Sequence, residues 1–160
     1  MHKSMTPWRN ARFAVFATVI SLGLFIASML MPFYSYTYFF QGRTMTFVEV
    51  FMANKQIIIP FVCIVVALTL QVVALIFMIF IPKKKAFQVT ASAFSFAAAF
   101  LSLAVCFISV CRLWVIPYEF DYFAKQNLES GYVVYTLFLL FNGILGCYMT
   151  AISGKIEEIS

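Results

Sequence analysis

Residues 74–92 read ALIFMIFIPKKKAFQVTAS, three consecutive lysines set between two strongly apolar runs. A charged side chain is costly inside a bilayer, so Lys83, Lys84 and Lys85 are expected at its surface. The runs on either side are each long enough to cross the hydrocarbon core, which is about 30 Å thick and needs about 20 helical residues. The lysines therefore mark a short connector between two antiparallel membrane helices, and they help to set the orientation of the chain.

The composition of the whole chain is that of a membrane protein. Hydrophobic residues make up 64% of its 160 residues and charged residues 11%, whereas about a quarter of the residues in soluble domains are charged. We expect an all-α membrane protein, a four-transmembrane-helix bundle that forms one domain over residues 1–160. The sequence predicts helices at about 13–33, 57–81, 87–111 and 131–153, outer loops at 34–56 and 112–130, and a connector at 82–86.

The basic residues are distributed unevenly between the two sides of this layout. One side carries Lys3, Arg9, Arg12, Lys83, Lys84, Lys85 and Lys155, and the other carries Arg43, Lys55, Arg112 and Lys125. By the positive-inside rule, both termini and the lysine connector are predicted to be cytoplasmic. We expect a multi-pass protein of the plasma membrane, and the lack of a recognisable sorting signal favours a bacterial inner membrane. The net charge of +5 follows the ends of apolar runs and predicts no nucleic-acid partner.

The first outer loop has the pattern of a small cap outside the membrane. Residues 34–38 read YSYTY, which alternates with the period of a strand, and residues 41–43, QGR, offer a turn before a second strand. We therefore expect a short extracytoplasmic β-hairpin. Thr46 and Glu49 have the spacing of a capping box, which predicts a brief helix over residues 47–54.

The function of this aromatic loop has two interpretations. The favoured one is an interfacial belt, because tyrosine concentrates at membrane surfaces. The alternative is a partner-binding edge strand, to which another chain adds a strand. Acidic residues of the two loops could also collect a cation, but no calcium-loop spacing is present, and a solvated loop is favoured. The residues that a partner would meet are Tyr34, Tyr36, Tyr38, Glu49, Glu119 and Asp121.

Small residues recur every four positions in the two C-terminal helices. In lipid, helices associate through close backbone approach at such residues. The run at 87–111 is therefore predicted to be the central packing helix. The rows consist of Ala91, Ser95 and Ala99, of Ala98, Ser102 and Cys106, and of Gly146, Thr150 and Gly154, with Gly143 three residues before Gly146.

Two amides lie near the middle of their predicted spans, Gln71 and Asn142. Because their helices run in the same direction, we expect them at similar depth, with Ser21 and Ser95 at about the same level. The sequence predicts a hydrogen bond between the two amides, which is worth about 0.6 to 2 kcal/mol in a membrane. The alternative is that they line a polar path for a substrate.

Catalytic and cofactor signatures are missing from the sequence. The single histidine is His2, at the terminus, and no acidic or basic residue lies in the middle of a span. The cysteines Cys63, Cys106, Cys111 and Cys147 show no Cys-x-x-Cys spacing and are interpreted as free thiols packed among apolar residues. We expect no enzyme, no cofactor and no metal site.

The layout of four spans, internal termini and a larger first outer loop resembles the claudin and tetraspan arrangement. The claudin first-loop pattern of Trp, Gly-Leu-Trp and two cysteines is absent. The resemblance therefore covers topology alone, and no site residue carries over from it.

We expect a non-catalytic membrane subunit or adaptor that associates with other membrane proteins through its small-residue helix faces and its aromatic outer loop. The alternative is an oligomeric transporter or channel component for a small or lipidic solute. Stoichiometry separates the two, because an adaptor binds a different polypeptide whereas a pore is a closed homo-oligomer.

Overall fold

The computed structural model describes residues 7–38, 41–53, 58–80, 85–111 and 125–155. Most of these residues lie in four long helices, each with a stretch long and apolar enough to cross a bilayer. The chain is therefore a multi-pass membrane protein. The helices are α1 (Pro7–Leu30), α3 (Ile58–Phe80), α4 (Lys85–Val110) and α5 (Ser130–Lys155).

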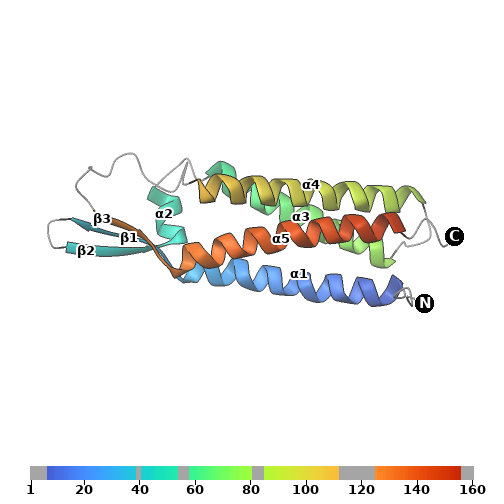
Figure 1. The fold of residues 1–160 in the computed structure, drawn as a ribbon, viewed down its shortest axis with the longest axis horizontal. Coiled ribbons are helices and arrows are strands. Elements are labelled where there is room, and N and C mark those ends of the chain that lie inside the picture. The colour runs from blue at the N-terminus through green and yellow to red at the C-terminus, as the bar shows by residue number, and fades with distance from the viewer. Residues whose placement is uncertain (1–6, 39–40, 54–57, 81–84, 112–124, 156–160) are drawn as a thin grey trace.

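The four long helices lie side by side as an elongated bundle (Figure 1). The most extensive contacts are those of α4 with α5 and of α4 with α3, followed by those of α1 with α5. Contacts between α1 and α3 are much less extensive. The predicted packing helix α4 is thus central together with α5, which contacts α4, α1 and β1. The start of α1 and the end of α5 lie at one end of the bundle, opposite the end that carries a small sheet.

Two predicted helix ends differ in the structure. The first helix ends at Leu30 rather than at residue 33, because a strand begins at Pro32. Proline lacks an amide donor and disfavours helical geometry in the residue before it. The third long helix already begins at Lys85, so the last lysine of the predicted connector belongs to a helix.

The cap is a three-stranded antiparallel sheet, not a hairpin alone. It comprises β1 (Pro32–Tyr38), β2 (Gln41–Thr46) and β3 (Lys125–Leu128), with β1 in the centre. The predicted hairpin of β1 and β2 is confirmed, but residues 41–43 were wrongly predicted as its turn. They lie within β2 and pair with residues 38–36 of β1. The third strand comes from the second outer loop and pairs Leu128 with Tyr34.

The short helix α2 (Phe47–Ala53) follows β2 directly, as the capping box predicts. The Thr46 backbone N–H donates to Oε2 of Glu49 over 2.7 Å, and the Glu49 N–H donates to the Thr46 hydroxyl over 3.4 Å. These reciprocal bonds satisfy two amides that the helix itself leaves unpaired. The capping box is therefore confirmed.

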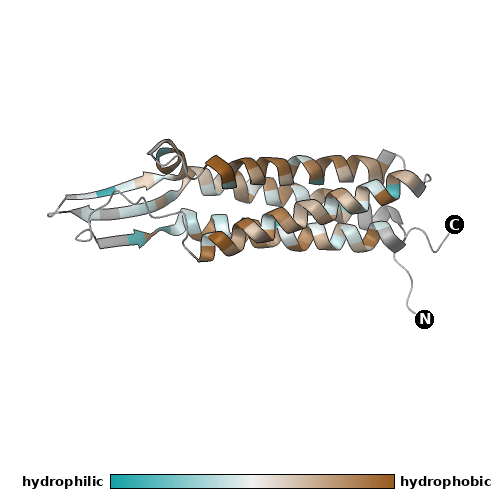
Figure 2. Cartoon of the chain, turned by 90° about the horizontal axis from the view of Figure 1, so that it is seen from above, coloured by the Kyte–Doolittle hydropathy of each residue, from teal (hydrophilic) through white to brown (hydrophobic). Residues whose placement is uncertain are grey.

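Two apolar clusters fill the interior, one toward the sheet and one toward the opposite end. The outer cluster comprises Phe33, Tyr34, Met45, Phe47, Val50, Ile64, Leu68, Val105, Cys106, Tyr132, Tyr135, Phe138 and Leu139. The inner cluster comprises Ala14, Ala17, Ala74, Leu75, Met78, Ala91, Leu145, Met149 and Ile152. Figure 2 shows that hydrophobic residues follow the long helices while the sheet is paler and more hydrophilic.

Aromatic side chains hold the cap on the bundle. The ring of Phe33 in β1 meets those of Phe47, Tyr132 and Tyr135 edge-on, with centroids 5.1, 5.5 and 5.6 Å apart. Such pairs contribute about 0.5 to 1.5 kcal/mol each beyond the area they bury. The sheet, α2 and α5 are therefore packed as one unit at the end of the bundle that carries the sheet.

Candidate functional site: a polar layer and an outer cap

A layer of buried polar side chains lies between the outer and inner clusters. Each long helix contributes to it at the point where its outer-cluster residues give way to inner-cluster residues. All of these side chains are at most 1% exposed. They are Ser21 of α1, Gln71 of α3, Ser95 and Ser102 of α4, and Asn142 of α5.

Asn142 is the centre of the hydrogen bonding in this layer. Its Oδ1 accepts a hydrogen bond from the Ser21 hydroxyl over 2.8 Å, and its Nδ2 donates to the Ser102 hydroxyl over 2.8 Å. One amide thus links α5 to both α1 and α4. Both contacts are fully buried, where an unmade hydrogen bond is costly.

The packing of α3 on α4 fixes the level of Gln71. The ring of Phe77 in α3 lies 5.4 Å from that of Phe87 and 6.2 Å from that of Phe94, both in α4. Phe77 is thus level with the part of α4 between these two residues. Gln71 lies six residues nearer the sheet end of the bundle, which places it close to the level of Ser95.

The predicted hydrogen bond between Gln71 and Asn142 is not formed. Asn142 pairs instead with Ser102, which is seven residues from Ser95, or about 10 Å along the helix axis. The predicted equal depth of the two amides came from counting residues from the start of each helix. In the packed bundle the two helices are offset along their axes, so the amides lie at different levels. Among the described residues, neither amide atom of Gln71 has a hydrogen-bond partner, and the Ser95 hydroxyl has none either.

The predicted small residues bring α4 and α5 together. A Cβ added to Gly146 would lie 2.9 Å from the Ala99 Cβ and 2.9 Å from the Ser95 carbonyl oxygen. A Cβ on Gly143 would lie 2.5 Å from a methyl carbon of Leu103. Both rows of α4 are also buried, namely Ala91, Ser95 and Ala99, and Ala98, Ser102 and Cys106. These faces therefore meet within the chain.

The predicted partner-binding residues of the cap have different environments. Tyr34 is buried in the outer cluster, so its ring is not available to a partner. Glu49 is exposed and lies 3.7 Å from Arg43 as an ion pair. Its hydrogen bonds with Thr46, and then the nearby Arg43 charge, hold the pKa of Glu49 below its usual value of 4.5.

The other predicted residues are placed by backbone or lie outside the described part. Tyr36 and Tyr38 lie in β1, opposite Arg43 and Gln41 of β2. Lys85 is the first residue of α4. Four of the predicted residues lie outside the described part of the chain, namely Glu119, Asp121, Lys83 and Lys84.

The contacts that hold the start of α5 against β1 were not predicted from the sequence. The Ser35 hydroxyl of β1 donates to Oε1 of Glu129, and the Glu129 N–H donates to the Phe33 carbonyl over 3.2 Å. Gly131 then passes so close to β1 that an added Cβ would lie 2.6 Å from the Pro32 carbonyl oxygen. In the sequence, these contacts are signalled only by Glu129 before α5 and by Ser130 and Gly131 at its start. Such residues are common where a helix begins.

No protein-family model matches the chain, and no curated protein matches it.

Proposed function

We propose that this protein is a non-catalytic integral membrane subunit that binds another membrane protein through its outer cap. The observation that carries the proposal is the open sheet. Within the described residues, β2 and β3 each pair with β1 alone, so each has an edge without a neighbouring strand. Unpaired strand edges readily accept a strand from another chain. Next to this sheet, α2 exposes the apolar side chains of Val48 and Met52.

The packing of the bundle narrows where a partner can bind. The small-residue faces of α4 and α5 meet each other, so they support the fold of the monomer rather than an outside contact. The cap is left as the surface with both hydrogen-bonding edges and exposed apolar side chains. We therefore place the partner contact there.

The proposed orientation follows from charge. Lys85 and Lys155 are the first residue of α4 and the last residue of α5, at the end of the bundle that carries no sheet. With the other basic residues predicted on that side, the positive-inside rule places this end in the cytoplasm and the cap outside. The favoured location is a bacterial inner membrane.

Native mass spectrometry of the gently extracted protein tests this proposal. We expect a defined complex in which a different polypeptide is present in fixed stoichiometry. Met52→Glu adds a charge to the exposed face of α2 and should reduce the recovered partner at least about tenfold, as expected for an interface residue that contributes above about 1.4 kcal/mol. Thr69→Val, at an exposed position on α3 away from the cap, should leave the complex intact.

A second function is favoured by Gln71 and Ser95. Their polar atoms are buried without partners among the described residues, as expected if a solute or water passes there in an oligomeric transporter or channel component. Recovery of a closed ring that holds copies of this chain alone would contradict the adaptor. Flux through reconstituted vesicles should then fall with Gln71→Leu and with Asn142→Leu.

A further inference from the structure

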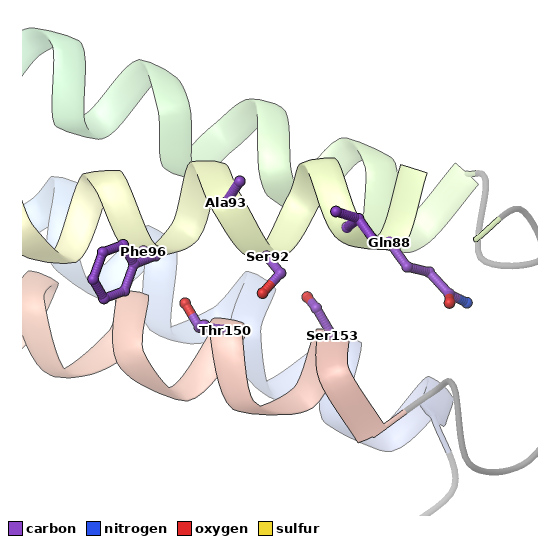
Figure 3. Close-up of a pocket in the computed structure, with 7 residues that line it drawn as sticks. Gln88, Ser92, Ala93, Phe96, Thr150 and Ser153 are labelled. Carbon is purple, nitrogen blue, oxygen red and sulfur yellow. The ribbon is translucent and has the colours of Figure 1, made fainter. Parts of the chain in front are cut away.

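A groove of about 370 Å³ lies between the first turns of α4 and the last turns of α5. Figure 3 shows the hydroxyl groups of Ser92, Thr150 and Ser153 pointing toward the gap between these two helices. Val89 and Phe96 give the groove an apolar wall, and the side chains of both are more than half exposed on the surface of the bundle. One depression therefore combines hydroxyl groups with a surface suited to a hydrocarbon chain.

The hydroxyl groups differ in what they can offer a ligand. Thr150 donates its hydrogen to the Gly146 carbonyl, and Ser153 donates to the Met149 carbonyl, each over 2.9 Å. Their oxygens can therefore only accept. Ser92 has no hydrogen bond to another described residue, and it is the hydroxyl that can donate to a carbonyl oxygen in the groove.

The position of the groove adds a charge preference. Its residues lie a few positions from Lys85, the first residue of α4, and from Lys155, the last residue of α5. None of the described residues that line it is acidic. Basic residues at a membrane surface attract anionic lipid headgroups. Lys85 and Lys155 are helix-end residues at the same end of the bundle as the groove. The sequence next to them adds Lys83 and Lys84 against Glu157 and Glu158, so basic residues still outnumber acidic ones there.

We propose that this groove binds one anionic phospholipid from the leaflet on the lysine side. The phosphate lies at the bundle end near Lys85 and Lys155, the Ser92 hydroxyl donates to an ester carbonyl, and an acyl chain lies along Val89 and Phe96. Neutral phospholipids offer the same esters and chains but no net negative charge. The site therefore distinguishes lipids by headgroup, independently of whether the cap binds a protein.

Native mass spectrometry of the purified protein with equimolar phosphatidylglycerol and phosphatidylcholine of identical acyl chains tests the site. We expect one phosphatidylglycerol retained in preference to phosphatidylcholine. Replacing Lys85 and Lys155 by glutamine should lower this preference about fivefold for each lysine removed. Equal retention of the two lipids by the unmodified protein, or an unchanged preference in the double variant, overturns the proposal.

Two bulky substitutions separate the groove from general lipid binding. Ser92→Phe fills the groove, and Val66→Phe adds a larger ring to an exposed position on α3. We expect Ser92→Phe to lose most of the bound phosphatidylglycerol while Val66→Phe keeps it. Circular dichroism checks that both remain helical, and the lysine variants, which lie at the helix ends, give an independent answer if Ser92→Phe does not fold. Equal retention by the two folded phenylalanine variants contradicts the site.

Discussion

At the scale of single residues, the two buried amides Gln71 and Asn142 have opposite roles despite their similar chemistry. Asn142 makes two hydrogen bonds to two other helices, whereas Gln71 has no partner among the described residues. When one partner of a buried hydrogen bond is removed, the polar group left behind is buried without a hydrogen bond, which lowers the free energy of unfolding. Replacing an amide that is already unpaired by an apolar side chain removes that same destabilising term. The same substitution should therefore have opposite effects at the two positions.

We expect Asn142→Leu to destabilise the bundle by about 1 to 2 kcal/mol, because Ser21 and Ser102 lose their partner. Gln71→Leu should leave stability unchanged or raise it by up to about 1 kcal/mol. Reversible unfolding in mixed micelles measures both. Equal destabilisation by the two substitutions would indicate that Gln71 has a bound partner, such as an ordered water molecule.

At the scale of elements, close backbone contact at one glycine joins α5 to β1. Gly131→Ala would place a Cβ 2.6 Å from the Pro32 carbonyl oxygen, and a backbone atom cannot move aside as a flexible side chain can. We expect a loss of about 1 to 3 kcal/mol, typical of overpacking. Gly23→Ala in α1 is the matched control, since nothing lies within 4 Å of its added Cβ. It should be neutral or stabilising by about 0.5 to 1 kcal/mol, and a similar loss in both variants would exclude the proposed clash.

The start of α2 should respond to acid through Glu49. Because folding lowers the pKa of this carboxyl below 4.5, its contribution is fully present above that pH and is lost as the pH falls through the folded-state pKa. We expect the capping bond to Thr46 to break in that range and the helix start to fray. An NMR titration of the Thr46 amide measures the transition. Glu49→Gln can keep a capping bond but does not titrate, so a transition that persists in this variant would assign it to another group.

At the scale of the whole molecule, the elements with local signals are the ones that the sequence predicts. The four spans follow from runs of apolar residues, and α2 follows from Thr46 and Glu49, which are three residues apart. The strand at residues 125–128 has no such signal, because KQNL is mostly polar and becomes a strand only beside β1. The partners of Asn142 depend on the offset between helices, which side-chain packing sets and which residue counting does not reveal.

The orientation of the molecule gives the last prediction. With the cap outside and the lysine end inside, a cysteine at exposed position Thr44 of β2 should react with a membrane-impermeant maleimide in intact cells. A cysteine at Lys155, the last residue of α5, should react only after lysis. Both substitutions belong in a background with Cys111→Ala and Cys147→Ala, because these two native thiols are free and exposed. The reverse pattern of labelling would place the cap in the cytoplasm, and the proposed partner would then have to be sought on that side.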